Sequence, residues 1–374
     1  MIGIITINPQ VYNYGGFLQE MALQDILKKL GYESEIINYE PQNEMLIFSM
    51  KRGIQYFSIH KMYNKLKDKW LKSTDENKAL EDTRKRKMAF DVYRKENLSI
   101  SLPYDYEQLH SGMLPYTTLI CGSDQIWNPD YSIPAFFLDF PLKGKKIAYA
   151  ASIGKDKLTY WQKKRYRELL KNLDYISVRE KSAVDIIGKL IQKDVELVLD
   201  PTLLHVPEYW INKAIKSSKK YQNYIFCYFL EISDAKIRAA EEFGKKMGCK
   251  LVVIPHLHGN DEMEFGDIKD PDVSPGDFLK MIYDAKFILT DSFHASVFSI
   301  LFQKKFYVFG RKSNGYSMNT RLETLLEYID AKDLLIQPRE LAEVEEYKYQ
   351  EFCMDKILQL QTESLHYISN AFES

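Results

Sequence analysis

The residues best suited to chemistry in this 374-residue chain stand in four short polar loops. The most specific loop runs from Thr290 to Ser299, where an apolar strand ends in Asp291-Ser292-Phe293-His294 and an apolar helix follows. A histidine beside the free amides of a helix start can exchange a proton with a bound anion. The alternative is a histidine with a structural role.

The second loop, Ser177-Val178-Arg179-Glu180, places an arginine directly after an apolar run and before a helix. A guanidinium there can hold a phosphate or carboxylate with two parallel hydrogen bonds. The other interpretation is an exposed ion pair between Arg179 and Glu180 or a helix neighbour, which would contribute little stability.

The third loop covers 121–129 and combines small, acidic, amide and aromatic side chains after a predicted buried strand. Such groups read sugar hydroxyls, and a Trp ring can cover a pyranose face. Its candidate binding residues are Ser123, Asp124, Gln125, Trp127 and Asn128. Alternatively, Trp127 belongs to the core and Asp124 caps a helix.

The fourth loop is Asn13-Tyr14-Gly15-Gly16, which follows the first strand and opens a helix. The two glycines permit close approach of the backbone, and the helix amides can receive an anion. The alternative is a tight turn before a helix.

These loops need a scaffold, and short apolar runs that alternate with helical segments predict one built of βαβ units with parallel sheets. The expected strands are 2–7, 35–39, 117–121, 146–151, 174–178, 195–199, 223–229, 250–254, 286–290 and 305–309. Helices are expected at 17–30, 233–247, 275–284 and 294–303. Ligands of such sheets bind beyond the carboxyl ends of the strands, where these loops lie.

The chain is long enough for two α/β domains. We expect a Rossmann-like domain at 1–203, with a basic helical insertion at about 45–110, and a second at 204–338. The boundary follows Asp200-Pro201-Thr202, where proline breaks regular pairing. Residues 339–374 are expected to form a terminal helix that braces the first domain, by analogy with two-domain enzymes of this kind.

Composition excludes several classes of protein. The net charge of -1 offers no general field for nucleic acid. The four cysteines are scattered, the start lacks the basic region of a secretion signal, and no apolar stretch is long enough to span a membrane, so we expect a cytoplasmic location. His256 and His258 lack further ligands at metal-site spacing, so no metal is expected.

One segment, 51–95, is strongly basic, with 14 Lys or Arg against 6 Asp or Glu. Its aromatic and apolar residues permit peripheral contact with the inner membrane surface. A solvated helical insertion explains the same composition.

Taken together, the four loops resemble the polysaccharide pyruvyl transferase family. The resemblance is carried by Asn-Tyr-Gly-Gly-x-Leu-Gln at 13–19, Gly-Ser-Asp-Gln-x-Trp-Asn at 122–128, Ser-Val-Arg at 177–179 and Asp-Ser-Phe-His at 291–294. It implies an α/β fold like that of GT-B glycosyltransferases, with two Rossmann-like domains facing a cleft that holds the active site. It also implies transfer of a pyruvyl group from phosphoenolpyruvate to a sugar or lipid-linked oligosaccharide as a ketal, without a metal or redox cofactor.

The resemblance also implies roles for single residues. His294 would be the general acid and base, Arg179 the anion clamp, and Asp124 the acceptor-binding residue or base. The amides after Asp291 would form a phosphate cradle. Further binding residues would come from the same loops, among them Ser177.

The chain departs from the family pattern at Ser292, where many members have an arginine. Either Arg179 acts with Arg311 or Arg321, or the donor differs. A nucleotide-sugar glycosyltransferase of the same shape and a non-catalytic carbohydrate-binding protein are the alternatives.

Overall fold

The strands near the amino terminus are apolar at successive positions because the sheet they form is covered on both faces. The computed structural model describes residues 1–7, 12–39, 76–130, 132–255, 265–313, 316–344 and 351–373. In it these strands form a six-stranded parallel sheet. Its order is β2-β1-β3-β4-β5-β6. The bounds are β1 Ile2–Ile5, β2 Ser34–Ile36, β3 Thr118–Gly122, β4 Lys145–Ala151, β5 Tyr175–Val178 and β6 Glu196–Leu197.

A second six-stranded parallel sheet follows, in the order β14-β11-β10-β7-β8-β9. Its strands are β7 Tyr224–Tyr228, β8 Lys250–Val253, β9 Ile268–Lys269, β10 Phe287–Thr290, β11 Phe306–Phe309 and β14 Leu335–Ile336. The two-residue strands β9 and β14 were not expected, because runs this short carry no readable periodicity. A small antiparallel pair, β12 Lys312–Ser313 and β13 Tyr316–Ser317, stands apart.

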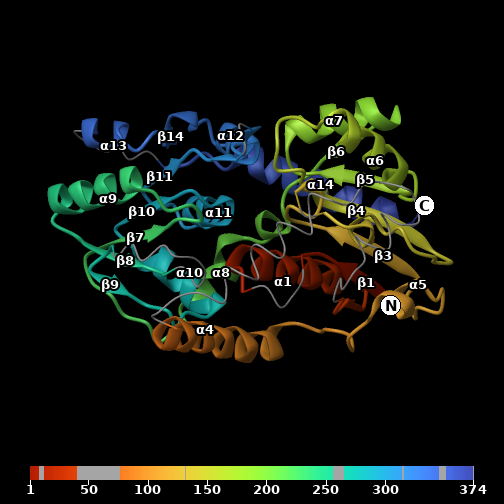
Figure 1. Cartoon of the computed structure of the whole chain (residues 1–374), viewed down its shortest axis with the longest axis horizontal. Helices are drawn as coiled ribbons and strands as arrows, with labels where there is room; N and C mark the ends of the chain where they lie inside the picture. Colours follow the sequence, from red (N-terminus) through yellow and green to blue (C-terminus); the bar gives the residue numbers. More distant parts are fainter. Residues whose placement is uncertain are drawn as a thin grey trace.

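Helices cover both sheets and form two lobes, as Figure 1 shows. The first lobe carries α1 Tyr14–Lys29, α5 Tyr106–His110, η1 Pro134–Phe137, α6 Tyr160–Leu170, α7 Lys181–Ile191 and η2 Pro201–Leu204. The second carries α8 Pro207–Ala214, α9 Asp234–Met247, α10 Pro275–Asp284, α11 Phe293–Leu301, α12 Thr320–Glu327, η3 Lys332–Leu334 and α13 Glu340–Glu343. We therefore describe the fold as α/β with two parallel sheets.

The expected insertion at about 45–110 lies partly outside the described residues. Its described part contains α4, Glu76–Asn97, which runs beside the second lobe (Figure 1). Arg86 donates from Nη2 to the carbonyl oxygen of Pro255 at 2.7 Å, and the buried Phe90 packs on Tyr14 with ring centroids 4.9 Å apart. Helix α4 thus packs on the second lobe as well as on α1.

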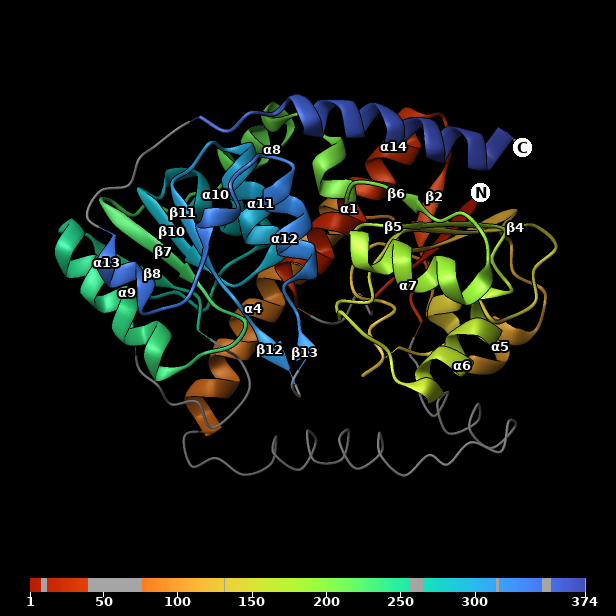
Figure 2. The same ribbon diagram turned by 90° about the horizontal axis from the view of Figure 1, so that it is seen from above.

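The sequence predicted one terminal helix over 339–374, but in its described residues the structure breaks this segment into two helices. Helix α13 ends at Glu343, and α14 begins only at Asp355 and runs to Glu373. Figure 2 shows α14 crossing from the second lobe to the first, so that the C-terminus lies near the N-terminus. The Leu199 amide donates to Ser364 Oγ at 2.9 Å, and Lys145 Nζ donates to the carbonyl of Phe372 at 2.7 Å.

Candidate active site between the lobes

His294 lies on the first turn of α11, directly after β10 of the second lobe. Ser292 precedes the helix as its N-cap, with Oγ accepting from the amide of Ala295 at 3.4 Å. The histidine is buried, and its Nε2 has no hydrogen-bond partner within the described part of the chain. The nearest carboxylate oxygen belongs to Asp200 of the first lobe, 3.7 Å from Nε2.

The other side of the imidazole faces the start of α1. A Cβ atom added to Gly15 would lie 2.0 Å from His294 Nδ1, far inside van der Waals contact. Only a residue without a side chain therefore fits at 15 while His294 keeps this position. The two helix starts consequently meet at the imidazole.

Arg179 follows β5 and reaches the same place from the first lobe. Its guanidinium pairs with Asp200 through Nη1 and with Asp124 through Nη2, the latter at 2.7 Å. All three side chains are almost completely buried. Arg179 and His294 thus come from opposite lobes and share Asp200.

This geometry differs from the anion clamp expected at Arg179. Two carboxylates already occupy the guanidinium, so Arg179 primarily fixes Asp124 and Asp200 in this structure. The alternative ion pair with Glu180 is not formed either, because the Glu180 carboxylate accepts from the amides of Ile153 and Gly154 at 2.9 and 3.0 Å.

Burial and charge oppose each other in this cluster. Burial alone would favour neutral carboxyls, but Arg179 and then His294 hold the pKa of Asp200 below its usual range. The pKa of Asp124 is likewise lowered, against burial, by Arg179, His294 and Arg321. Both carboxylates are therefore ionised at neutral pH.

A second arginine from the other lobe completes the cluster. Arg321 on α12 lies with Nη1 3.9 Å from Asp124 Oδ1. The ring of Phe293 has the guanidinium of Arg179 4.5 Å from its centroid and that of Arg321 at 5.6 Å. Attraction between cations and the ring face helps hold both guanidiniums near the imidazole.

The first turn of α1 contributes backbone groups. Asn13 caps it, its Oδ1 accepting from the amide of Gly16 at 3.1 Å. Gly16 lies beside Asp124, because an added Cβ would be 3.8 Å from Oδ2. Gln19, which sequence reasoning missed, accepts from the Ser123 amide at 2.9 Å and donates to the carbonyl of Gly16 at 2.9 Å. It joins the helix to the loop after β3.

Asp291 has a positioning role. Its carboxylate accepts from the amides of Leu230 and Glu231 at 2.5 and 3.0 Å and from Lys236 Nζ at 2.7 Å. It therefore holds the loop after β7 against the start of α11. Arg311 belongs to this group, with Nε 3.9 Å from Asp291 and 3.8 Å from Glu231.

The backbone amides that follow Asp291 fall into two groups, those with a hydrogen-bond acceptor and those at the free start of α11. The Ser292 amide donates to Thr290 Oγ1 at 3.0 Å, and that of Ala295 is capped. The amides of Phe293 and His294 occupy the first two helical positions, which have no partner within a helix.

The loop at 121–129 is split between two roles. Ser123 Oγ donates to Asp200 Oδ2 at 2.9 Å, so Ser123 and Asp124 join the cluster. Trp127 instead stacks on Phe137 at 5.2 Å and donates to the carbonyl of Phe136 at 2.9 Å. Its ring is completely buried and cannot cover a sugar, which corrects the expected binding role.

Three further expected binding residues also serve the loops themselves. Gln125 packs on Gly154, where an added Cβ would lie 2.3 Å from Nε2. Asn128 Oδ1 accepts from the amide of Asp130 at 3.0 Å. Ser177 Oγ donates to the carbonyl of Ala148 at 3.0 Å, between strands.

Asp200 is the residue that sequence reasoning overlooked. It was treated only as part of a domain boundary, yet it is the carboxylate shared by Arg179, Ser123 and His294. The signal was present, because Asp200 closely follows β6 and thus occupies the position that singled out the other loops.

A small cavity of about 10 Å³ lies beside the cluster and is lined from both lobes, by Arg179, Asp200, Phe293 and Arg321 among others. Among the residues that the structure describes, no group of three or more His, Cys, Asp or Glu is arranged to hold a metal ion. His256 and His258 lie outside those residues.

Sequence comparison identifies the family of the chain. The sequence model of the polysaccharide pyruvyl transferase family matches residues 13–313. The chain belongs to this family. The match includes all four loops and every residue of the cluster except Arg321.

Comparison with solved structures places this pyruvyl transferase family member among enzymes of GT-B fold. The UDP-GlcNAc 2-epimerase of Methanocaldococcus jannaschii superposes with a TM-score of 0.50 and 10% identity, over 100% of this chain and 99% of that one. UGT89C1 of Arabidopsis thaliana, complexed with UDP-L-rhamnose, gives a TM-score of 0.50 and 10% identity over 100% and 97%. At this identity the likeness shows the fold alone. A search of curated proteins finds no match.

Proposed function

We propose that this protein transfers a pyruvyl group from phosphoenolpyruvate to two hydroxyls of a sugar, in a cell-surface polysaccharide or its lipid-linked precursor, as a ketal. The observation that carries the proposal is the meeting of His294, Asp200 and the guanidiniums of Arg179 and Arg321 at two helix starts. A proton carrier lies there beside Arg321 and the amides of a helix start, which attract a small phosphorylated acid, while Arg179 holds the two carboxylates.

The reaction makes definite demands. A proton must reach the methylene carbon of the enol, which leaves positive charge at C2, and a sugar hydroxyl attacks C2 and loses its proton. Phosphate then departs, and a second hydroxyl attacks the same carbon, loses its proton and closes the ketal. One proton is gained by carbon and two are released by the hydroxyls, of which the phosphate takes one.

We assign these steps to residues of the cluster. His294 exchanges the protons, and the Asp200 carboxylate lies 3.7 Å from its Nε2. Arg321 and the amides of Phe293 and His294 receive the anionic groups of the donor. Asp124, held by Arg179, orients or deprotonates the acceptor hydroxyl, and the negative charge of both carboxylates favours the cationic C2. No cofactor is required.

The proposal also includes a cytoplasmic location for the protein. All four cysteines are free thiols, which suits the reducing cytoplasm where phosphoenolpyruvate is made. No helix in the described ranges has the length and apolarity to cross a bilayer.

His294→Ala tests the assignment. We expect transfer of labelled pyruvyl groups from phosphoenolpyruvate to extracted lipid-linked oligosaccharides to fall by roughly 100-fold or more. His366→Ala, which alters an exposed histidine on α14, is the control and should leave the rate unchanged. Transfer by the His294 variant at the control rate would remove this residue from the mechanism.

The donor is tested separately by thermal unfolding. A ligand that binds only the native state raises the melting temperature. We expect phosphoenolpyruvate to do so and a panel of UDP- and GDP-sugars to have no effect. Stabilisation by nucleotide sugars alone would replace the proposal with a glycosyltransferase.

A further inference from the structure

Two adjacent aromatic side chains at the start of α6 are exposed to solvent. Tyr160 is 73% and Trp161 72% exposed, and their rings contact edge to face at 5.3 Å. Trp161 differs in this from Trp127 and Trp210, which are completely buried. Because neither ring packs into the core, the two rings form an exposed apolar patch. Such a patch indicates contact with a partner outside the chain.

The same helix face is basic. Helical spacing aligns Tyr160 with Lys163, Arg167 and Lys171, and Trp161 with Lys164, whose Nζ lies 5.9 Å from the indole centroid. The buried side of α6 is formed by Tyr166, Leu169 and Leu170. Aromatic rings and cations therefore share the outer face of one helix.

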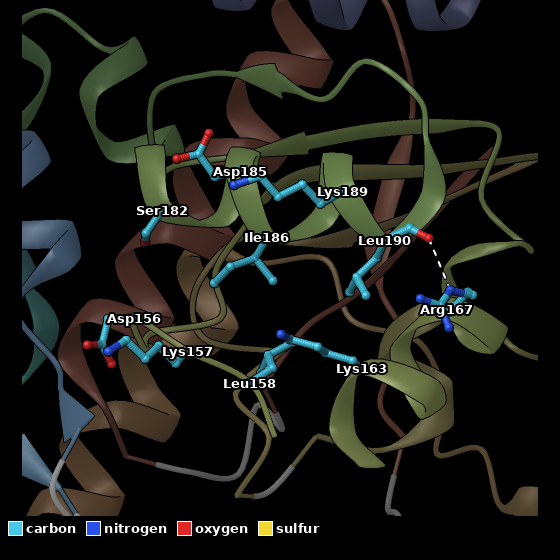
Figure 3. Close-up of a pocket in the computed structure, with 10 residues that line it drawn as sticks. All are labelled: Asp156, Lys157, Leu158, Lys163, Arg167, Ser182, Asp185, Ile186, Lys189 and Leu190. Atoms are coloured by element: carbon cyan, nitrogen blue, oxygen red, sulfur yellow. Dashed lines mark hydrogen bonds between the residues drawn. The ribbon is translucent and has the colours of Figure 1, made fainter. Parts of the chain in front are cut away.

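A groove beside this face continues onto α7, and four Lys or Arg and the two carboxylates of Asp156 and Asp185 line it. Figure 3 shows Lys157 and Lys163 on one side of it and Ile186 and Lys189 of α7 on the other. This cavity of about 520 Å³ adjoins a second of the same size, which adds Lys171 and Lys193 to its rim. Apolar residues form its floor, among them Leu158, Ile186 and Leu190.

Positive charge is concentrated in this part of the chain. Residues 155–193 contain eleven Lys or Arg against five Asp or Glu, whereas the whole chain carries a net charge of only -1. Within this segment Lys155, Arg179 and Glu180 are buried, which leaves nine Lys or Arg against four Asp or Glu among the other residues. The field is therefore local to one face.

We propose that this face, formed by α6, α7 and the groove between them, docks on the surface of a bilayer that contains anionic lipids. Trp and Tyr rings settle at the level of the lipid headgroups, with their apolar bodies toward the chains. Lysine and arginine at the same height attract the phosphates. The combination on one face favours a membrane over a soluble polyanion, which would need the cations but not the exposed rings.

The docked orientation would bring the lobe boundary near the membrane. Helix α7 begins two residues after Arg179, and Lys181 on its first turn pairs with Glu327 of α12. Docking itself does not depend on the proposed reaction, so it is tested without an activity assay.

Vesicle sedimentation of the full chain provides the first test. We expect the protein to bind vesicles of phosphatidylcholine that contain about 30% phosphatidylglycerol by weight. It should bind little to vesicles of phosphatidylcholine alone. The double variant Lys163→Gln, Arg167→Gln should bind the anionic vesicles roughly 20-fold more weakly. Salt at about 0.5 M should also weaken binding of the unaltered protein. Arg238→Gln with Lys245→Gln on α9 removes the same charge from exposed positions in the other lobe and should change nothing.

Tryptophan fluorescence provides the second test, in a Trp70→Phe background. Trp161 is then the one indole that is not buried, so anionic vesicles should shift the emission to the blue and protect it from aqueous acrylamide. Trp161→Ala should weaken sedimentation with the anionic vesicles while the circular dichroism stays unchanged. Equal loss of binding in the α9 variant, or a spectral shift with oligosaccharide but none with vesicles, would overturn membrane docking.

Discussion

At the residue scale, the position of His294 depends on the absence of a side chain at Gly15. The imidazole occupies the space of a side chain on α1, with Asp200 on its other side. Arg179 holds Asp200 and Asp124 as carboxylates, and a buried pair of this kind is costly to break because the remaining charge loses its partner. The four side chains of His294, Asp200, Arg179 and Asp124 therefore fix one another's positions.

Gly15→Ala tests this packing. The new methyl must displace the imidazole, and a misplacement of about 1 Å can reduce turnover roughly 100-fold. The free energy of unfolding should fall by about 1–3 kcal/mol, because the buried imidazole must shift to admit the methyl. Transfer rate and urea unfolding are the measurements. Gly188→Ala in α7, where the nearest atom would be 3.7 Å away, should keep full activity. Unchanged turnover in the Gly15 variant would contradict the proposed contact.

At the element scale, helix starts and helix crossings place the site. Capping by Asn13 and Ser292 sets where α1 and α11 begin, and both starts lie at the carboxyl ends of strands. Helix α14 supports this arrangement from behind, since its Ser364 receives the amide of Leu199, the residue before Asp200. It thus contacts the segment that carries the shared carboxylate.

Two substitutions on α14 separate burial from helix propensity. Ile368 is 4% exposed and Leu358 is 52% exposed. Ile368→Ala should lower the free energy of unfolding by about 2–5 kcal/mol through lost burial and a cavity. Leu358→Ala should change it by about 0.5 kcal/mol or less. Chemical denaturation measures both. Equal effects would mean that α14 is not held by its buried face.

At the scale of the whole molecule, the two lobes meet through apolar contacts at one side and charged groups at the other. Tyr14 of α1 is buried, stacks on Phe278 of the second lobe at 4.7 Å and donates to the carbonyl of Val273 at 3.0 Å. The Lys181–Glu327 pair between α7 and α12 is exposed and contributes less than about 1 kcal/mol. The lobes are therefore joined by buried aromatic packing on the side of α1 and by an exposed ion pair on the side of α12.

Tyr14 variants test which side holds the lobes together. Tyr14→Ala should cost about 3–5 kcal/mol of unfolding free energy, because it removes a ring buried between the lobes. Tyr14→Phe should cost about 1 kcal/mol, because it removes one hydrogen bond. Denaturation followed by fluorescence compares them. A phenylalanine variant as unstable as the alanine variant would show that the hydrogen bond, and not the ring, dominates.

The sequence by itself determined the alternation of strands and helices, because burial on both faces of a parallel sheet demands continuous apolar runs. It also singled out the loops of Asp124, Arg179 and His294, since polar residues after such runs stand out. Their resemblance to one family was read from motifs that survive as short local strings.

Only the tertiary structure decided which of these residues act together. Asp200 became the shared carboxylate because β6 ends opposite α11, a relation between distant segments that no local pattern encodes. The same holds for Trp127, whose place in the core was left open by its sequence neighbours and was settled by Phe137 stacking on it. Packing across lobes also decided that Arg179 faces two carboxylates, because its partners lie 55 and 21 residues away along the chain.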